Sequence, residues 1–389
     1  MHFAFTEEQW GLRLAVRALL DRDGGPHVPA PPPAPAPAGH DPELWRRLGA
    51  EIGAAGLTVP EEHGGSGATL VESCLVAEEL GRRLVPSPFV GGTALAVEAL
   101  LAAGDPAAAD RLLPGIAAAE RLVALAWAEP ENPWRDAGFA TTARLDAGRW
   151  LLDGCKSFVL DGARADAFLV VATSPDGPAL FEVDAAAVAV LPQPTVDSTR
   201  PLCAVELAAA PAVPIGAAGP IRAAGPIGVA GPTGAAGPVL ARCRDAAAVL
   251  LAAECIGAAD RWLGEIVGHV QTRVQFGRPI GSFQAIKHRL ADLYVAVESA
   301  RSLSYAASWA VGTRDERGSA WASMAKSLCC ETYRDVAAEG VQLHGGIGIT
   351  WEHEAHLHLK RAHGTAQLFG TPREHRRRLE SLPGALGSR

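Results

Sequence analysis

The sequence predicts a multi-domain protein of the α plus β class, with an N-terminal helical domain, a middle β domain and a C-terminal four-helix bundle. Three observations support this prediction. Apolar residues recur at helical spacing in the first 119 residues, and they do so again from Leu240 to the end. Between them, residues 121–213 consist of short apolar runs bounded by Gly, Pro and Asp. We therefore expect domains at residues 1–120, 121–215 and 240–389.

The N-terminal domain begins with helical patterning from Thr6 to Asp23, behind a Thr-x-Glu start that suits a helix cap. A Pro/Ala-rich tract follows at residues 24–39, where we expect a stiff, extended linker. Helical patterning resumes where Asp41 can cap a helix with Pro42 at its first position. Residues 70–84 and 91–113 continue this pattern, and each is expected to form a helix.

Strands are expected in the middle domain because no long helical pattern interrupts its short apolar runs. These runs are residues 122–127, 150–153, 168–173 and 179–183. After this domain, residues 216–239 read GAAGPI, RAAGPI, GVAGPT and GAAGPV, a six-residue motif present four times. This period excludes a collagen helix, and each unit is too small to bury a core of its own. We expect an expanded surface loop there.

The C-terminal part of the chain shows four long helical patterns with short connections, which predicts a helix bundle. The four patterns cover residues 244–273, 283–309, 319–343 and 357–369. Helices, then strands, then a bundle is an uncommon order of elements.

Composition narrows the class of protein further. The chain has 389 residues and a net charge of −8, from 35 Lys and Arg against 43 Asp and Glu, which argues against nucleic acid or an anionic membrane as the main partner. The longest apolar run, residues 246–257, is interrupted by Glu254 and is too short for a membrane span. The N-terminus lacks a signal-peptide pattern, and seven scattered cysteines suit reduced thiols. We expect a cytoplasmic protein.

Three motifs fall on this frame in a fixed order. The first is VPEEHGGSG at residues 59–67, followed by EELG at 78–81. The second is RVQFGRPI at residues 273–280, followed by FQA and LAD. The third is QLHGGIG at residues 342–348. Together, around a β domain, they resemble the acyl-CoA dehydrogenase family over nearly the whole chain, which implies a middle domain built as a β-barrel or orthogonal sheets.

The second and third motifs have the chemistry of a phosphate-binding site. The planar fork of Arg273 suits a pyrophosphate, and the glycine pair Gly345-Gly346 at a helix end offers bare backbone to a ligand. Taken singly, Arg273 also suits a surface ion pair, and the glycine pair suits an ordinary helix C-cap. The resemblance implies that these groups hold FAD, partly across a subunit interface. The implied cofactor-binding residues are Arg273, Phe276, Gly277, Gln284, Gln342, Gly345, Gly346, Thr371, Ala128 and Phe158.

The family's reaction needs a carboxylate that removes the proton α to a thioester carbonyl while hydride leaves the β carbon for the flavin. The resemblance places this Glu at one of two positions, occupied here by Phe369 and Ala247. Neither side chain can accept a proton. Glu254 is a weak candidate for a relocated base, although a hydrogen-bonded structural role suits it better. Leu160, where the family presents Thr to the flavin, cannot donate a hydrogen bond.

These departures favour a subunit without its own base in a heteromeric dehydrogenase that acts on acyl-CoA or an acyl-carrier-protein thioester. Such a subunit would form a dimer or tetramer with a related dehydrogenase chain and would share FAD with it. Three alternatives remain open: a complete homo-oligomeric dehydrogenase with a relocated base, a flavin monooxygenase of the same fold, and a flavin-free structural relative.

Two further groups of residues, one of histidines and one of cysteines, do not indicate a functional site. His353, His356 and His358 lie at spacings that suit one helical face, yet no Cys or Asp cluster completes a metal site, so no metal is expected. Cys329 and Cys330 point in different directions on a helix, which argues against a redox pair formed between them.

Overall fold

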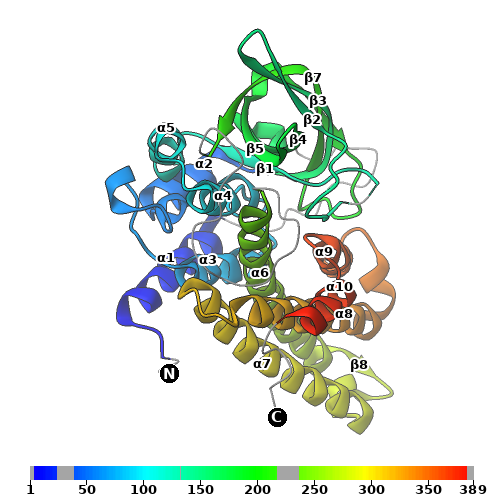
Figure 1. Ribbon diagram of the computed structural model, residues 1–389. Coiled ribbons are helices and arrows are strands. Elements are labelled where there is room, and N and C mark those ends of the chain that lie inside the picture. Colours follow the sequence, from blue (N-terminus) through cyan, green and yellow to red (C-terminus); the bar gives the residue numbers. More distant parts are fainter. Residues whose placement is uncertain (1–3, 24–38, 132, 217–235, 383–389) are drawn as a thin grey trace.

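The computed structural model describes residues 4–23, 39–131, 133–216 and 236–382. A domain of β-strands sits above a large helical body, and the helices of both chain ends pack side by side within that body (Figure 1). The order of helical, β and helical domains is the one predicted. The predicted linker at residues 24–39 and most of the predicted loop at residues 216–239 lie outside the described residues.

The N-terminal helices begin at the caps that the sequence predicts. Asp41 accepts hydrogen bonds from the backbone N–H of Glu43 and Leu44, with Pro42 at the first position of its helix. The single helix expected over 91–113 is wrong, because Gly104 adopts a left-handed backbone and Asp105 caps a new helix. The helices are α1 (Glu7–Asp23), α2 (Pro42–Arg46), α3 (Leu70–Arg82), α4 (Leu95–Ala103) and α5 (Pro106–Ala117). A π-helical turn, η4 (Val90–Ala94), leads into α4.

The middle domain is a closed sheet. Its strands are β1 (Val123–Ala126), β2 (Thr142–Asp146), β3 (Arg149–Leu160), β4 (Ala167–Ser174), β5 (Gly177–Asp184), β6 (Ala189–Gln193) and β7 (Leu202–Ile215). Strands pair in the order β4-β2-β3-β7-β5, and β5 also pairs with β4, so these five close into a barrel. β1 adds to β4, and β6 adds to β7. The barrel therefore holds its own small apolar core, separate from the larger helical one.

The C-terminal bundle contains α6 (Gly237–Thr272), α7 (Gln284–Gly312), α8 (Gly318–His344) and α9 (Ala355–Gln367). A two-stranded ribbon of β8 (Val274–Gln275) and β9 (Arg278–Pro279) joins α6 to α7, and a 3-10 turn, η8 (Gly345–Ile349), follows α8. The helix α6 begins at Gly237, inside the predicted loop. A further helix, α10 (Pro372–Ser381), was not predicted, although Thr371 and Glu374 form its capping box.

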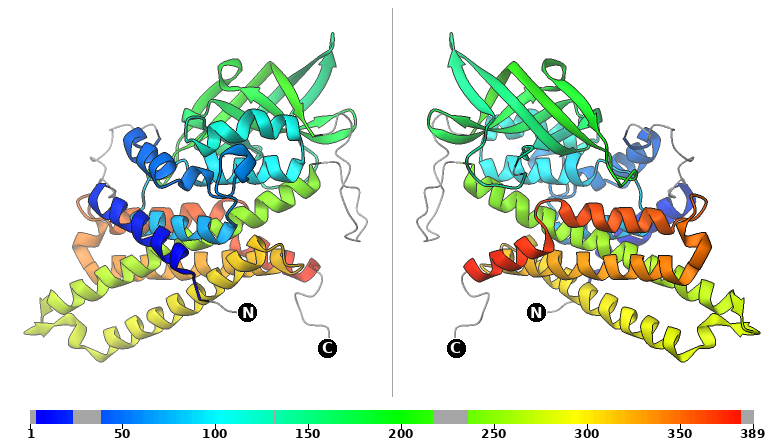
Figure 2. Two further views of the ribbon diagram at one scale, coloured as in Figure 1. Left: turned by 90° about the vertical axis from the view of Figure 1, so that its left-hand side faces the viewer. Right: turned by 90° about the vertical axis from the view of Figure 1, so that its right-hand side faces the viewer.

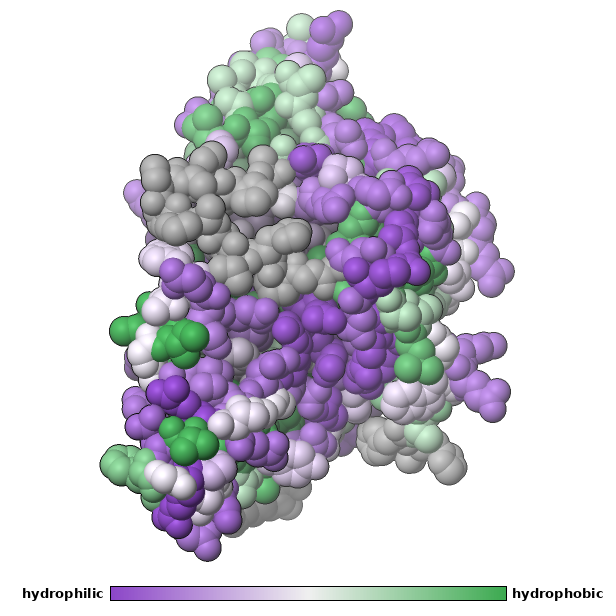
Figure 3. All heavy atoms as spheres, turned by 180° about the vertical axis from the view of Figure 1, so that it is seen from behind, coloured by the Kyte–Doolittle hydropathy of each residue, from purple (hydrophilic) through white to green (hydrophobic). Residues whose placement is uncertain are grey.

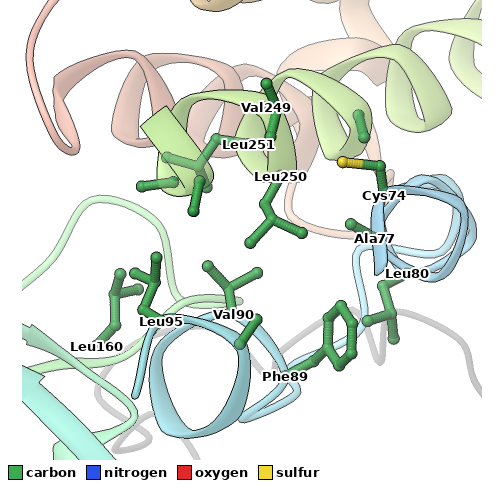
Figure 4. Packing of buried hydrophobic residues seen from close by; sticks show 14 of the residues in the cluster. Cys74, Ala77, Leu80, Phe89, Val90, Leu95, Leu160, Val249, Leu250 and Leu251 are labelled. Atoms are coloured by element: carbon green, nitrogen blue, oxygen red, sulfur yellow. The ribbon is translucent and has the colours of Figure 1, made fainter. Parts of the chain in front are cut away.

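The helices α3, α4 and α6 pack together through aliphatic side chains. Leu80 of α3, Leu95 of α4 and Leu250 of α6 meet in the packing that Figure 4 shows, and Leu160 of β3 reaches the same core. In Figure 2, α6 runs from beneath the β domain to the far end of the bundle. Within the described ranges, no helix is long and apolar enough to cross a membrane.

Candidate functional site

A cavity of about 1040 Å³ lies between the β domain and the C-terminal helices. Phe158 and Leu202 line it from the barrel, and Gly370, Thr371 and the start of α10 line it from the bundle. Phe158 sits at a bulge of β3 with a left-handed backbone (φ 54°), and its N–H donates to Gln193 Oε1 at 2.7 Å. The structure therefore brings together two of the predicted cofactor residues, Phe158 and Thr371.

An aromatic cluster of Trp127, Trp134 and Phe369 occupies one wall of this cavity. Phe369, at the predicted base position, packs against Trp134 with ring centroids 4.4 Å apart, and only 4% of its surface is exposed. Trp134 Nε1 donates to the carbonyl of Gln367 at 2.9 Å, which ties the loop before β2 to the end of α9. The position where a carboxylate is expected is therefore filled by a hydrocarbon ring that packs against both tryptophans.

Arg244 of α6 holds the loop that carries Trp134. Its guanidinium donates to the Trp134 carbonyl at 2.8 Å and to both carboxylate oxygens of Asp136, and it lies over the Trp127 ring at 4.8 Å. The sequence analysis singled out neither Trp134 nor Arg244 as a site residue, although residues 131–136 read ENPWRD where the resemblance implies a glycine-rich turn. The large, hydrogen-bonding residues in place of glycines were the available signal.

The other titratable groups lining the cavity are already engaged. His375 is buried: its Nε2 bonds the Phe369 carbonyl at 3.1 Å, which requires a proton on Nε2, and its Nδ1 lies 3.3 Å from Ser323 Oγ. Burial lowers the pKa of His375 to about 3, so the ring is neutral with neither nitrogen free. Glu374 accepts hydrogen bonds in the capping box of α10.

Two further acidic side chains and one further histidine that line the cavity are candidates for a base. Asp197 accepts from the N–H and hydroxyl of Thr199 and pairs with Arg361 at 3.4 Å. Asp136 pairs with Arg244. His363 is exposed to solvent, whereas a base for this chemistry works in a dry pocket. None of the described lining residues therefore has the environment of the missing base.

Glu254 does not line this cavity. It is buried in α6, where it forms an ion pair with Arg200 and borders a separate crevice of about 20 Å³. Arg200 lines both spaces, and its buried Nη1 has no hydrogen-bond partner among the described residues. The geometry gives Glu254 the structural role that the sequence favoured.

Two other predicted positions lie away from the cavity. Ala247 is fully buried in α6 and does not line it. Ala128 is also buried, and its carbonyl accepts a hydrogen bond from Ser157 N–H at 2.9 Å.

The remaining predicted cofactor residues gather at the far end of the bundle. Arg273 ends α6, Phe276 and Gly277 form the turn of the β8–β9 ribbon, and Gln284 begins α7. Gln342 lies in the last turn of α8, and Gly345 caps that helix with φ 62°. All of these are exposed, and Arg273 forms no ion pair with any residue that the structure describes. A Cβ at Gly277, Gly345 or Gly346 would meet nothing within 4 Å, so these backbones are open to a ligand.

The cavity and this exposed end lie far apart within one chain. Arg244, at the cavity, and Arg273 are 29 residues apart on one helix, which corresponds to about 44 Å along its axis. This exceeds the span of one dinucleotide. A single FAD molecule therefore cannot reach both groups of residues in the same chain.

The histidines and cysteines of the C-terminal bundle contact neighbouring residues within it. No group of three or more His, Cys, Asp or Glu side chains in the described parts of the chain can hold a metal ion. His358 is buried in the bundle and stacks on Trp262 at 4.4 Å. Cys329 Sγ lies near the carbonyl of Ala300, whereas Cys330 Sγ lies 3.7 Å from Cys255 Sγ.

Comparison with known proteins identifies relatives along the chain. The family models described as "Acyl-CoA dehydrogenase, N-terminal domain" and "Acyl-CoA dehydrogenase, C-terminal domain" match residues 6–120 and 240–380. The chain is 38% identical to the acyl-CoA dehydrogenase IpdE2 of Mycolicibacterium smegmatis over 376 residues, which cover 97% of this chain and 99% of that protein.

Two solved structures share the fold over nearly their whole length. The Tcur3481-Tcur3483 steroid ACAD matches with a TM-score of 0.80 and 29% identity, over 97% of each chain. The ChsE4-ChsE5 complex from Mycobacterium tuberculosis matches with a TM-score of 0.83 and 26% identity, over 100% of each chain.

Proposed function

Because the chain belongs to the acyl-CoA dehydrogenase family, we propose that it is the subunit without a catalytic base in a heteromeric, FAD-dependent dehydrogenase. The complex would desaturate an acyl thioester between its α and β carbons. The observation that carries this proposal is Phe369, which lies at the cavity where the base is expected and packs against Trp134. A partner chain would supply the carboxylate that removes the α proton.

The residues of this chain fit one end of FAD well. Arg273 carries a charge without an ion-pair partner among the described residues, so it can make charge-assisted bonds to a pyrophosphate. The open backbone at Gly345 and Gly346 and the exposed amide of Gln342 can hold the adenosine part. When bound, FAD supplies the hydride acceptor.

The cavity end suits a planar ring less completely. Phe158 and Thr371 line the cavity and can contact a ring system. Leu160 points instead into the core between β3, α4 and α6 (Figure 4), so it offers neither a donor nor a contact there. The phosphate-binding end is therefore the better preserved of the two.

Sharing of FAD between chains follows from the separation of the two ends. Since about 44 Å of α6 separates Arg244 from Arg273, the residues near Arg273 must serve a cofactor whose ring lies in another chain. That end also exposes apolar side chains, since Phe276 is 90% and Val295 63% exposed. Figure 3 shows scattered hydrophobic groups at the lower left of the face that it draws. Both features support association with a second chain there.

A different chain is the better partner than a second copy. A homo-oligomer would bring Phe369 to every cavity and would place no carboxylate at the expected base position in any of them. The ChsE4-ChsE5 complex and the Tcur3481-Tcur3483 steroid ACAD, each named for two proteins, support a heteromer. The second also supports a bulky, steroid-like acyl group in the substrate.

The decisive experiment is anaerobic bleaching of flavin absorbance by acyl-CoA thioesters, including bulky ones. The measurement is made on three samples. They are the lone wild-type chain, the lone Phe369→Glu variant, and the wild-type chain combined with a related dehydrogenase that carries Glu at the position of Phe369, directly before the residues that match Gly370-Thr371. We expect acyl-CoA thioesters to bleach the flavin absorbance only in the sample that combines the two chains. The Phe369→Glu variant should stay inactive, because Trp134 and Leu160 remain.

Rapid bleaching by the lone wild-type chain would overturn the proposal and indicate a relocated base. Oxygen consumption that depends on NAD(P)H, without desaturation, would instead indicate a monooxygenase.

A further inference from the structure

Three histidine rings, those of His344, His353 and His358, pack around Trp262 toward the exposed end of the bundle, and a fourth, His269, packs on His344. His269 and His344 stack with centroids 4.2 Å apart, and His344 and His353 are 4.4 Å apart. Trp262 stacks on His344 at 5.1 Å and on His358 at 4.4 Å. The four histidines, here called the histidine cluster, come from α6, α8, the segment after η8, and α9.

The hydrogen bonds within the cluster are few. His344 Nδ1 donates to the Gly340 carbonyl at 2.7 Å, and His358 Nδ1 lies 2.9 Å from the Tyr333 hydroxyl. Three buried ring nitrogens have no partner among the described residues: Trp262 Nε1, His269 Nε2 and His358 Nε2. No carboxylate is hydrogen-bonded to any of the four rings in the described structure. Nothing in the cluster therefore compensates a positive charge on a ring.

The charged groups that face the cluster are mainly positive. Burial is the main cause that lowers the pKa of His269, His353 and His358. Neighbouring groups lower it further: His344 and then Arg273 act on His269, the rings of His344, His269 and His356 act on His353, and Arg261 and Arg361 act on His358. Glu265 opposes this at His353, and Glu354 is paired with Arg261. Burial and these neighbours therefore favour the neutral form of His269, His353 and His358.

The cluster joins the two segments that carry the exposed cofactor-binding residues. His269 is four residues before Arg273, and its carbonyl accepts the Arg273 N–H at 2.8 Å. His344 directly precedes Gly345, the cap of α8. The contact between these two rings therefore sets the position of Gly345 and Gly346 relative to Arg273.

We propose that the histidine cluster is a pH-sensitive latch, whose protonation releases residues 344–353 from the end of α6. Below about pH 6.5, an opened segment with ordinary histidines binds protons that the closed cluster excludes, so acid favours opening. Above that pH, opened and closed forms bind equal numbers of protons, and the latch stays closed. The consequence for FAD rests on the proposed function: the cofactor would be held more weakly in acid.

The test is hydrogen–deuterium exchange of the full chain between pH 7.5 and 5.5, with rates corrected for the intrinsic pH dependence of exchange. In the wild type, the corrected rate for residues 344–353 should rise ~10-fold or more, the effect at pH 5.5 of one ring that takes up a proton, with an ordinary pKa of about 6.5, only in the opened form. The rate for α4 should not change.

Two variants make the test specific. In the double variant His269→Gln, His353→Gln, which alters half-buried residues, the rise should shrink to about threefold or less, because fewer rings titrate. The control His63→Gln removes a half-buried histidine that lies beside Asp110, and it should behave as the wild type. A pH-independent rate in the wild type, or an equal rise in the double variant, would refute the latch.

Flavin content is measured on the same samples. Loss of protection in acid by a chain that never binds flavin would leave the latch intact and contradict the proposed function. If the chain binds flavin but the protection of residues 344–353 does not depend on pH, the latch is refuted and the proposed function stands.

Discussion

Aromatic residues with a left-handed backbone occupy two positions at the cavity. Phe158 has φ 54° and Phe369 has φ 55°, a conformation that side-chain-bearing residues adopt at a cost of about 1–3 kcal/mol. Surrounding contacts must maintain it: the Gln193 bond at Phe158, and the Trp134 stack at Phe369. Such strain commonly marks functional positions, which agrees with a functional role for this cavity.

Charged residues in the interior contribute to the stability of the fold rather than to the reaction. Replacing Glu254 by Gln leaves the buried Arg200 without its ion-pair partner, and we expect a loss of roughly 3–5 kcal/mol in the free energy of unfolding. Guanidinium denaturation measures this loss. The control is Glu43→Gln, which breaks an exposed pair with Arg46 and should cost less than about 1 kcal/mol. Equal, small effects of both changes would show that Arg200 finds another partner.

Glu129 gives the β domain an acid-dependent stability. Burial alone would raise its pKa, but hydrogen bonds from Lys156, Ala140 N–H and Thr141 N–H outweigh it and hold the pKa at about 2. The unfolded chain has the higher pKa, so this stability is complete above about pH 4.5 and is lost as the pH falls toward 2.

Glu129→Gln should therefore lower the stability by roughly 2–3 kcal/mol at pH 7 and flatten its decline in acid. Urea unfolding at pH 7, 4 and 3 measures both effects. Asp146→Asn, which removes an exposed partner of Arg144, serves as the control and should change neither. A variant whose acid decline is as steep as that of the wild type would contradict this assignment.

Among the helices, α3 and α6 approach each other through glycines. A Cβ at Gly257 would lie 1.9 Å from the carbonyl oxygen of Glu78, and one at Gly81 would lie 2.1 Å from that of Glu254. Only glycine permits this distance, because the obstacle is backbone that cannot rotate away. The close crossing anchors the middle of α6, from which the helix extends to the cavity on one side and to Arg273 on the other.

Gly257→Ala should force the two helices apart and lower the stability by about 3 kcal/mol or more. The matched control is Gly264→Ala on the same helix, where a Cβ meets nothing within 4 Å. It should raise the stability by about 0.5–1 kcal/mol, because alanine favours helix. Midpoints of guanidinium unfolding compare the two, and a mild effect at Gly257 would mean that α3 can shift.

At the scale of the whole molecule, α6 links the cavity lined by Phe369 to the exposed end that carries Arg273. The cavity borders the barrel, and the far end of α6 lies at the tip of the bundle (Figure 2). Under the proposed function, a second chain would complete both regions. The histidine cluster lies at the tip, where it can link that association to pH.

Arg273→Gln should weaken FAD binding by roughly 1.5–3 kcal/mol, the value of a charge-assisted contact, while the fold stays intact. Flavin fluorescence titration of the assembled pair measures the affinity. Arg317→Gln, at an exposed residue beside Asp315, is the control and should bind FAD as the wild type does. Unchanged affinity in Arg273→Gln would remove this residue from the cofactor site.

Helix ends were predictable where a cap signal was used and were missed where it was overlooked. Asp41-Pro42 was recognised and begins a helix, while Asp105-Pro106 and Thr371-Pro372 carry similar signals and begin α5 and α10. The predicted helix 357–369 ends early, at Gln367, because Phe369 adopts a left-handed backbone.

The sequence by itself determined the order of domains and the family, and it predicted that Phe369 and Ala247 stand where a base is expected, because periodicity, motifs and residue type are local properties of the chain. Only the tertiary structure decided what these and the other buried side chains contact. The packing of Trp134 on Phe369, the pairing of Glu254 with Arg200 and the histidine rings packed on Trp262 each join segments far apart in sequence. Such contacts depend on packing geometry, which no local pattern records.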